Sequence, residues 1–303
     1  MILSTAGRIG NAVLHGVLRM NPLLLEFANG HAFFAGMVLA AVGSLLGIWR
    51  CSGWRAHLPR LAVVLGIVLV VSSATPLPRG VLAGWLVAVL AAVGTGGRAA
   101  MPRLRKAAAV LAVLGSVGLA LFELPYHLPP RIELAPGQSI YVVGDSLSAG
   151  TGSGERPWPA VLAEEYGLRV TNLAAAGATA GRALQQVEGI EEEAAVVLVH
   201  IGGNDLLAGR ENAVFEDHLD RLLGALRRRQ ARIVLFELPL IPFHNDFGRR
   251  QRAVAARYQV PLIPKRYTTR PLGTRGGTLD GLHLSQRGHD VMARGVAELL
   301  RAE

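Results

Sequence analysis

Three short segments of the sequence carry residue types that hydrolytic chemistry requires. They are Gly144-Asp145-Ser146, Gly202-Gly203-Asn204-Asp205 and Asp280-Gly281-Leu282-His283. The first two follow apolar runs of strand length, and the third stands before the last segment of helical period. Gly, Asp and Ser are also common in turns, so Ser146 by itself does not indicate a nucleophile. A nucleophilic serine needs a base, a group that orients the base, and donors for an oxyanion.

Asp280 and His283 have the spacing of a carboxylate–imidazole pair. They stand three residues apart, so one local turn lets the carboxylate accept a hydrogen bond from one ring nitrogen. The other ring nitrogen is then available to accept the proton of Ser146. We therefore predict that Ser146 is the nucleophile, that His283 is the general base, and that Asp280 orients His283.

Three positions offer donors for the oxyanion of a tetrahedral intermediate. The Asn204 side chain carries an amide NH₂ group, and a glycine at position 177 permits close approach of its backbone N–H. Ser146 supplies its own backbone N–H. We predict an oxyanion hole formed by Ser146, Gly177 and Asn204.

Apolar runs of strand length alternate with segments of helical period in the second half of the chain. The candidate strands are Ile140–Val143, Leu168–Leu173, Ala195–Ile201, Arg232–Glu237 and Val260–Ile263. The candidate helices are Trp158–Tyr166, Ala180–Gly189, Val214–Arg229, Phe247–Tyr258 and Ser285–Arg301. This alternation predicts an α/β fold with a parallel sheet and helices on both faces. In such sheets the chemistry lies beyond the carboxyl ends of the strands, where the loops named above meet.

Taken in chain order, these residues resemble the SGNH/GDSL hydrolase family. Its four name-giving residues correspond to Ser146, Gly177, Asn204 and His283. Trp158-Pro159-Ala160 further resembles the arylesterase, thioesterase and lysophospholipase branch of that family. The resemblance covers roughly residues 138–301. Gly177 lies in an Ala-rich loop, so its match is looser than the others, and Gly181 is an alternative to it.

The resemblance implies a flavodoxin-like three-layer fold and a hydrolase of acyl or acetyl esters that uses neither a metal nor a cofactor. The roles it implies for Ser146, His283 and Asp280 are those given above. Ser148 stands where the second glycine of a Gly-x-Ser-x-Gly elbow would be, which argues against the α/β-hydrolase fold of lipases. Cys51 is the only cysteine, so the chain can form neither an internal disulfide nor a thiolate metal site.

Five further polar residues have simpler interpretations than catalysis. Asp145 and Asp205 are predicted to accept hydrogen bonds that brace their loops. His200 is predicted to be a core histidine with satisfied hydrogen bonds, and His289 to lie away from the active face. For His244, the loop after the fourth strand, 239–244, either rims the substrate pocket or is a plain surface loop; the sequence leaves both open.

Four long uncharged stretches give the first half a different character. They are residues 32–49, 61–78, 80–97 and 107–122, and they account for the high apolar content of 51%. Stretches near eighteen apolar residues have the length needed to cross the hydrocarbon core of a bilayer. We therefore expect an α-helical transmembrane domain at 1–130 with about four spans, followed after the linker 124–130 by a hydrolase domain at 131–303. Residues 1–31 are read as an interfacial segment.

The net charge of +9 belongs almost wholly to this first half. Residues 1–130 carry +8 and residues 131–303 carry +1. The basic residues concentrate in two loops, which contain Arg50, Arg55 and Arg60 in one and Arg98, Arg103, Arg105 and Lys106 in the other. By the positive-inside rule both loops are cytoplasmic, which puts both termini and the hydrolase domain on the periplasmic or exterior side. The charge thus reflects membrane topology, and nucleic-acid binding is not expected.

These observations lead to one main functional hypothesis and two alternatives. The main hypothesis is a multi-pass protein of the cytoplasmic (inner) membrane that hydrolyses carboxylic esters through an acyl-serine intermediate. Anchoring favours a substrate that is lipid-like or bound to the cell envelope, and both a lysophospholipid and an O-acetylated glycan remain open. The alternatives are an O-acyltransferase acting on envelope glycans and a non-catalytic binding module of the same fold.

Overall fold

The computed structural model describes residues 22–49, 53–94 and 102–302. The chain divides into two compact units. Of the described residues, 22–25, 129–239 and 250–302 form the α/β unit, and 26–128 and 240–249 form the helical unit. Cys51, Arg50, Arg98 and most of the N-terminal interfacial segment lie outside the described residues.

The α/β unit is built on a five-stranded parallel sheet. Its strands are β2 (Ile140–Gly144), β3 (Val170–Asn172), β4 (Val196–His200), β5 (Arg232–Phe236) and β6 (Leu262–Ile263), in the order β3-β2-β4-β5-β6. The strands β2 and β4 are buried along their whole length, which explains why each reads as a continuous apolar run. A second, two-stranded parallel sheet pairs β1 (Ile132–Leu134) with β7 (Leu300–Ala302).

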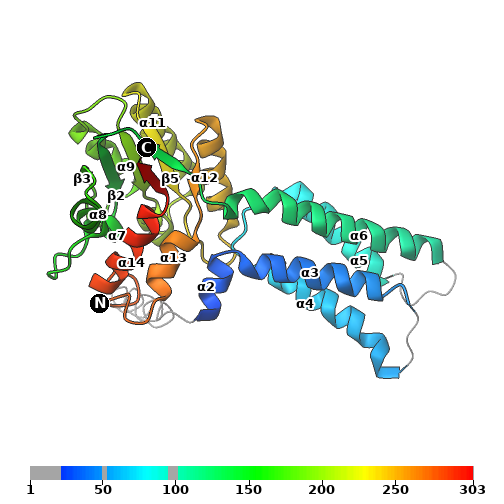
Figure 1. Cartoon of the computed structure of the whole chain (residues 1–303). Coiled ribbons are helices and arrows are strands. Elements are labelled where there is room, and N and C mark those ends of the chain that lie inside the picture. The colour runs from blue at the N-terminus through cyan, green and yellow to red at the C-terminus, as the bar shows by residue number, and fades with distance from the viewer. Residues whose placement is uncertain (1–21, 50–52, 95–101, 303) are drawn as a thin grey trace, which may run out of the picture. The chain divides into compact units, whose positions relative to one another are not determined.

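Helices cover the sheet and pack against one another in two groups (Figure 1). One group contains α8 (Trp158–Tyr166), α13 (Arg266–Gly273) and α14 (Gln286–Ala297). The other contains α9 (Ala180–Gln186), which continues into the 3₁₀ turn η4 (Val187–Gly189), and α11 (Asn212–Arg228). The remaining helices of this half are α7 (Ser146–Ala149), α10 (Gly203–Leu207) and α12 (Asn245–Arg257).

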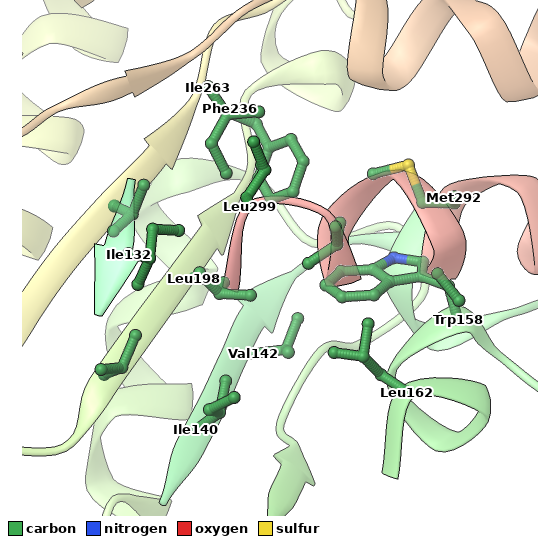
Figure 2. Packing of buried hydrophobic residues seen from close by; sticks show 14 of the residues in the cluster. Ile132, Ile140, Val142, Trp158, Leu162, Leu198, Phe236, Ile263, Met292 and Leu299 are labelled. Atoms are coloured by element: carbon green, nitrogen blue, oxygen red, sulfur yellow. The ribbon is translucent and has the colours of Figure 1, made fainter. Parts of the chain in front are cut away.

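A buried apolar cluster fixes α8 and α14 on the sheet. Figure 2 shows Trp158 and Leu162 of α8 beside Val142 of β2, with Met292 of α14 close to the indole. The Trp158 and Phe236 rings lie 6.1 Å apart between centroids. Burying an aromatic ring of this size contributes more to stability than burying any aliphatic neighbour, so Trp158 is the main anchor of α8.

The sequence predicted the order and type of these main elements, and the structure corrects one of them. Residues 300 and 301 were expected to belong to the last helix, whereas residues 300–302 form β7 beside β1. The correction has a physical cause, because Ile132 and Leu134 are buried apolar residues that need a neighbouring strand. The short elements β1, α7, α10 and α13 were not predicted.

The helical unit contains four apolar helices. They are α3 (His31–Leu46), α4 (Leu58–Ser72), α5 (Arg79–Gly94) and α6 (Pro102–Glu123), preceded by α2 (Pro22–Ala28), with 3₁₀ turns η1 (Gly53–His57) and η3 (Leu124–His127). Helix α3 packs on α4 and α6, and α5 packs on α6. Gly36 and Gly66 permit the close approach of α3 and α4, since a Cβ on either would lie 2.7 Å from a backbone atom of the other helix.

The structure does not show the four expected membrane spans. Of the described helical segments, Arg103–His127, with 25 residues, is the one that is long and apolar enough to cross a bilayer by length and composition. The helices α3, α4 and α5 have 16, 15 and 16 residues, shorter than the eighteen-residue stretches that they overlap. In the stretch 61–78 the last six residues are not helical, and Pro76 and Pro78 cannot donate the backbone hydrogen bonds that would continue the helix.

Residues 240–249, which are most of the loop after β5 and the start of α12, belong to the helical unit. The Asn245 side chain donates to the Ser73 carbonyl at 3.2 Å, and Arg249 donates to the Leu77 carbonyl at 3.0 Å. Asp246 accepts hydrogen bonds from Arg79 and Arg249. His244 is exposed and its ring bonds only the carbonyl of Pro242 among the described residues.

Candidate active site

The loops with predicted chemistry emerge where the strand order reverses. The chain leaves β2 toward β3 on one side and later returns to β4 on the other, which is where ligands of such sheets bind. Gly144 at the end of β2 and His200 at the end of β4 are directly paired in register. The segments Asp145–Ser146 and Gly202–Asp205 therefore start side by side.

The turn that carries Ser146 is tightly packed. A Cβ at Gly144 would lie 2.9 Å from the His200 carbonyl oxygen, so the end of β2 requires glycine. The Gln186 side chain accepts the N–H of Gly144 and donates to its C=O, each at 2.9 Å, on the side where the ladder with β3 has ended. The Gly144 C=O also accepts the Ala175 N–H at 3.1 Å. Asp145 caps α7 by accepting the Leu147 N–H at 3.0 Å. Ser146 is the first residue of α7 and is half-buried.

Asp280 and His283 form the predicted pair. The His283 Nδ1 and Asp280 Oδ2 atoms lie 2.7 Å apart, and Asp280 Oδ1 accepts the N–H groups of Leu282 and His283 at 2.9 and 2.8 Å. Gly281 makes this turn possible, since its φ of +93° is a conformation that other residues rarely adopt. Partial burial raises the pKa of Asp280, but the bonds from His283 and from both amides outweigh it and lower the pKa to about 2. The carboxylate is therefore ionised at neutral pH.

Side chains of the segment after β4 form hydrogen bonds with the backbone of the loop that contains Gly177. One N–H of the Asn204 amide donates to the Ala178 carbonyl at 2.9 Å, which leaves its second N–H for another acceptor. The buried Asp205 carboxylate accepts the Ala180 N–H at 2.8 Å. Adjacent residues of one loop thus fix the segment 178–180 from both sides.

Gly177 and its alternative Gly181 have different surroundings. Gly177 is exposed with a φ of +71°, and no atom lies within 4 Å of where its Cβ would be. Gly181 lies in α9, and a Cβ there would lie 2.9 Å from the His218 ring. Close packing against His218 accounts for Gly181, whereas Gly177 keeps an open backbone beside Ala178.

Charged residues of the two other loops, His283 and Asp205, act electrostatically on the carboxyl of Asp145. Its carboxyl is buried, and burial raises its pKa to about 6, against the opposing hydrogen bond from Leu147. The charges of His283 and Asp205 also act on this carboxyl, the first lowering its pKa and the second raising it. Asp145, Asp205 and His283 therefore lie within electrostatic range of one another.

The structure does not bring every predicted partner into contact. Among the described residues, no hydrogen bond joins the Ser146 hydroxyl to His283. His283 nevertheless lies within electrostatic range of Asp145, the residue before Ser146. Catalytic hydrogen bonds commonly tighten only when the substrate is bound. Within the same residues, no group of three metal-ligating side chains is present.

The simpler interpretations of Asp145, Asp205 and His200 are confirmed. Asp145 and Asp205 brace their loops through the bonds to Leu147 and Ala180. His200 is buried, with hydrogen bonds at both ring nitrogens. His289 is buried, and its Nδ1 accepts the backbone N–H of Trp158 at 3.2 Å. Sequence reasoning missed Gln186, because a glutamine within a helical pattern gives no signal that it brackets a strand end.

Comparisons with known proteins find sequence relatives of the α/β unit. A sequence model of the GDSL-like lipase/acylhydrolase family matches residues 142–291. Esterase TesA of Pseudomonas aeruginosa is 32% identical over 143 residues, which are 43% of this chain and 71% of that protein. Thioesterase 1/protease 1/lysophospholipase L1 of Escherichia coli strain K12 is 27% identical over 195 residues, which are 58% of this chain and 92% of that protein. The crystal structure of the psychrotrophic esterase EstA from Pseudoalteromonas sp. has a TM-score of 0.48 at 21% identity and covers 53% of this chain and 95% of that one.

The fold and these matches define a hydrolase of ester bonds with a parallel sheet covered by helices. The chain belongs to the GDSL-like lipase/acylhydrolase family. The α/β unit contains all of the residues matched by the family model except 240–249, so the esterase, thioesterase or lysophospholipase type of activity is assigned to this unit.

Proposed function

We propose that the chain is a serine esterase in which Ser146, His283 and Asp280 are the catalytic residues. The observation that carries this proposal is the 2.7 Å contact between His283 and Asp280, together with the shared electrostatics of His283 and Asp145, the residue before Ser146. An ionised Asp280 at one ring nitrogen holds the proton of His283 on Nδ1, which leaves Nε2 as the acceptor.

The proposed reaction proceeds in two steps. His283 Nε2 takes the Ser146 hydroxyl proton while Ser146 Oγ attacks the acyl carbon, and the oxyanion accepts hydrogen bonds from Ser146, Gly177 and the free N–H of Asn204. The carbon–oxygen bond to the leaving alcohol breaks as that alcohol takes the proton from His283. Water, activated by His283 in the same way, then releases the acid from the acyl-serine.

Fluorophosphonate labelling tests the nucleophile. The full chain should be labelled at Ser146, and Ser146→Ala should abolish both labelling and ester hydrolysis. Ser153→Ala, in the exposed loop after α7, is the matched control and should leave both unchanged. A folded wild-type chain that takes no label and hydrolyses no ester would favour the non-catalytic binding module.

We further propose that the helical unit is embedded in the cytoplasmic membrane and anchors the enzyme there. Its helices expose apolar side chains on their outer surface, where a water-soluble bundle would carry polar ones. The most exposed include Val38, Leu61, Val68, Val87, Leu90, Leu111, Leu114 and Leu121. Lipid is the solvent that suits such a surface. The 15- and 16-residue helices are short for a bilayer, and local thinning or the flanking apolar segments compensate.

Anchoring leads us to propose an ester substrate that is lipid-like or attached to the envelope. The test is a series of p-nitrophenyl esters from acetyl to palmitoyl, offered to the full chain in proteoliposomes. A preference for long acyl groups supports a lysophospholipid-like substrate, and a preference for acetyl supports an O-acetylated glycan. If the acyl group passes to an added glycan instead of appearing as free acid, acyl transfer replaces hydrolysis as the function.

A further inference from the structure

A chain of buried polar side chains lies beneath the turn that carries Ser146, and the proposed reaction makes no use of it. Its members are Ser148 of α7, Trp158 of α8, His200 of β4 and Thr268 of α13. All four are at most 2% exposed to solvent. Burying polar groups at such depth costs free energy unless they bond one another, so this arrangement calls for an explanation.

The side chains are joined by a continuous series of hydrogen bonds. Ser148 Oγ lies 3.2 Å from His200 Nδ1 and receives the Trp158 Nε1–H at 3.2 Å. On the other side of the ring, His200 Nε2 lies 3.2 Å from Thr268 Oγ1. The ring itself packs against Phe236, with 4.5 Å between centroids. His200 therefore links the helix that carries the nucleophile to a strand of the central sheet and to α13.

Hydrogen-bond satisfaction favours one direction for these bonds. The indole N–H of Trp158 can only donate, so Ser148 Oγ accepts there. Among the described residues, His200 Nδ1 is the one acceptor bonded to the Ser148 hydroxyl, so donation to that nitrogen satisfies the hydroxyl proton. His200 then carries its proton on Nε2 and donates it to Thr268. Burial lowers the pKa of His200 to about 4, so the ring is neutral at physiological pH, as this arrangement requires.

Ser148 is also a fixed point of the backbone around the nucleophile. Its N–H bonds the Asp145 carbonyl at 3.0 Å, and its own carbonyl accepts the Asn172 side chain at 2.8 Å. Helix α7 has only four residues, too few to be stable by its own hydrogen bonds. The placement of Ser146, two residues earlier, therefore depends on what holds Ser148.

We propose that His200 is a positioning residue for ester hydrolysis: its ring, held between Thr268 and Ser148, fixes α7 and so aims the hydroxyl and the backbone N–H of Ser146. The proposal rests on the proposed role of Ser146 as nucleophile. It assigns a function to Ser148, which occupies the place of the second glycine in the lipase elbow. A displacement of the nucleophile of about 1 Å is enough to lower turnover about 10²-fold.

The test compares Ser148→Ala, His200→Leu and the double variant in the full chain. Each single change should lower kcat and the rate of fluorophosphonate labelling about tenfold or more, because the Ser146 hydroxyl is no longer held in the orientation for attack. KM should stay within about twofold of wild type, because the substrate still binds. The double variant should be no slower than the slower single one, because the two residues act as one unit. His200→Asn, whose amide reaches the position of Nδ1, should recover part of the activity lost in His200→Leu.

Controls separate positioning from stability and from the proposed function itself. Met292→Leu alters the same core without a polar contact and should lower the unfolding temperature without changing kcat. Thr268→Val, which keeps the side-chain shape, should lower kcat in the same direction and provides the test if His200→Leu fails to fold. Variants that fold and keep kcat within about twofold of wild type, or effects that multiply in the double variant, would overturn the proposal. Activity retained in Ser146→Ala would instead remove the proposed nucleophile.

Discussion

The Asp280 carboxylate accepts three hydrogen bonds from within one four-residue turn, and only one of them comes from the His283 ring. Replacing Asp280 by Asn preserves the shape but removes the charge that stabilises a protonated His283. It also allows the ring to carry its proton on the wrong nitrogen. We expect Asp280→Asn to lower kcat about 10²-fold or more with a smaller change in KM.

The measurement is steady-state hydrolysis of p-nitrophenyl butyrate. Asp217→Asn is the control, since Asp217 is an exposed carboxylate that pairs with Arg221 on the surface of α11. A loss of activity in Asp280→Asn no larger than in this control would contradict the orienting role of Asp280.

The Asn204 amide serves two acceptors in the proposed site, the Ala178 carbonyl and the oxyanion. Asn204→Ala removes both donors, and we expect kcat to fall by about 10²–10³-fold, the usual effect of losing one oxyanion donor. Asp205→Asn disturbs the same loop but removes no proposed donor to the oxyanion, so it should reduce kcat much less. Equal effects from the two changes would show that Asn204 acts only by bracing the loop.

Acidification changes the stability of the fold in opposite directions through two buried titratable groups, Asp145 and His200. The pKa of Asp145 is about 6 in the folded chain and 3.8 ordinarily. Its contribution to the free energy of unfolding is therefore present below pH 3.8 and is lost as pH rises through 6. The pKa of His200 is about 4 when folded and 6.5 ordinarily, so its contribution is present above pH 6.5 and is lost as pH falls through 4. Each shift corresponds to about 3 kcal/mol of unfolding free energy.

These signs are testable by thermal unfolding of the detergent-solubilised chain at pH 7 and pH 4.5. Acidification should destabilise Asp145→Asn more than wild type, because the compensating proton uptake at Asp145 is gone. It should destabilise His200→Leu less than wild type, because no buried ring remains to be protonated. The reverse ranking would mean that burial does not control the pKa values of these two groups.

At the scale of elements, the sequence was most informative where one element is long and uniform. The strands β2 and β4 were predicted because both faces are buried, which produces continuous β-branched runs. The four- and five-residue helices α7 and α10 were missed, since so few residues carry no periodic signal. Strand β7 was read as helix because Leu299 and Leu300 continue the helical period, while its partner β1 lies far away in the sequence.

The same contrast holds for the candidate site. Ser146, Asn204, Asp280 and His283 were predicted from residue types and spacing in loops, where polar residues follow apolar strands. Side chains that support the loops from helices, such as Gln186, gave no comparable signal. A polar residue in an amphipathic helix usually faces solvent, and only a tertiary contact distinguishes one that does not.

The loop with Gly177 allows a test of backbone conformation alone. Gly177→Ala meets no atom within 4 Å, so its cost is the left-handed φ of +71°, about 1–2 kcal/mol. If the residue's N–H helps to bind the oxyanion, kcat should fall along with this small loss of stability. Gly152→Ala is matched, with a φ of +78° and equally open space, and should cost similar stability without lowering kcat. A fall in kcat shared by both variants would remove Gly177 from the oxyanion hole.

At the scale of the whole molecule, charge and hydropathy divide the chain in the same way as the fold. The helical unit pairs an apolar outer surface with basic residues gathered in two loops. Gly30, Thr75 and His127 meet at one end of its helices, and Gly43 of α3 packs against Pro59 of α4 near the other end. Among the described basic residues, Arg55 lies in η1, Arg60 at the start of α4, and Arg103, Arg105 and Lys106 at the start of α6. On the membrane topology that we propose, the positive-inside rule places these basic residues on the cytoplasmic side.

The single cysteine makes this topology testable with little alteration of the chain. Cys51 lies in the first basic loop, so on the proposed topology a membrane-impermeant maleimide should not label it in right-side-out spheroplasts. It should react once the membrane is permeabilised. A Cys51→Ser, Ser153→Cys variant moves the thiol to an exposed loop of the α/β unit and should react without permeabilisation. Labelling of Cys51 from outside, with Ser153→Cys protected, would invert the topology and place ester hydrolysis on the cytoplasmic side.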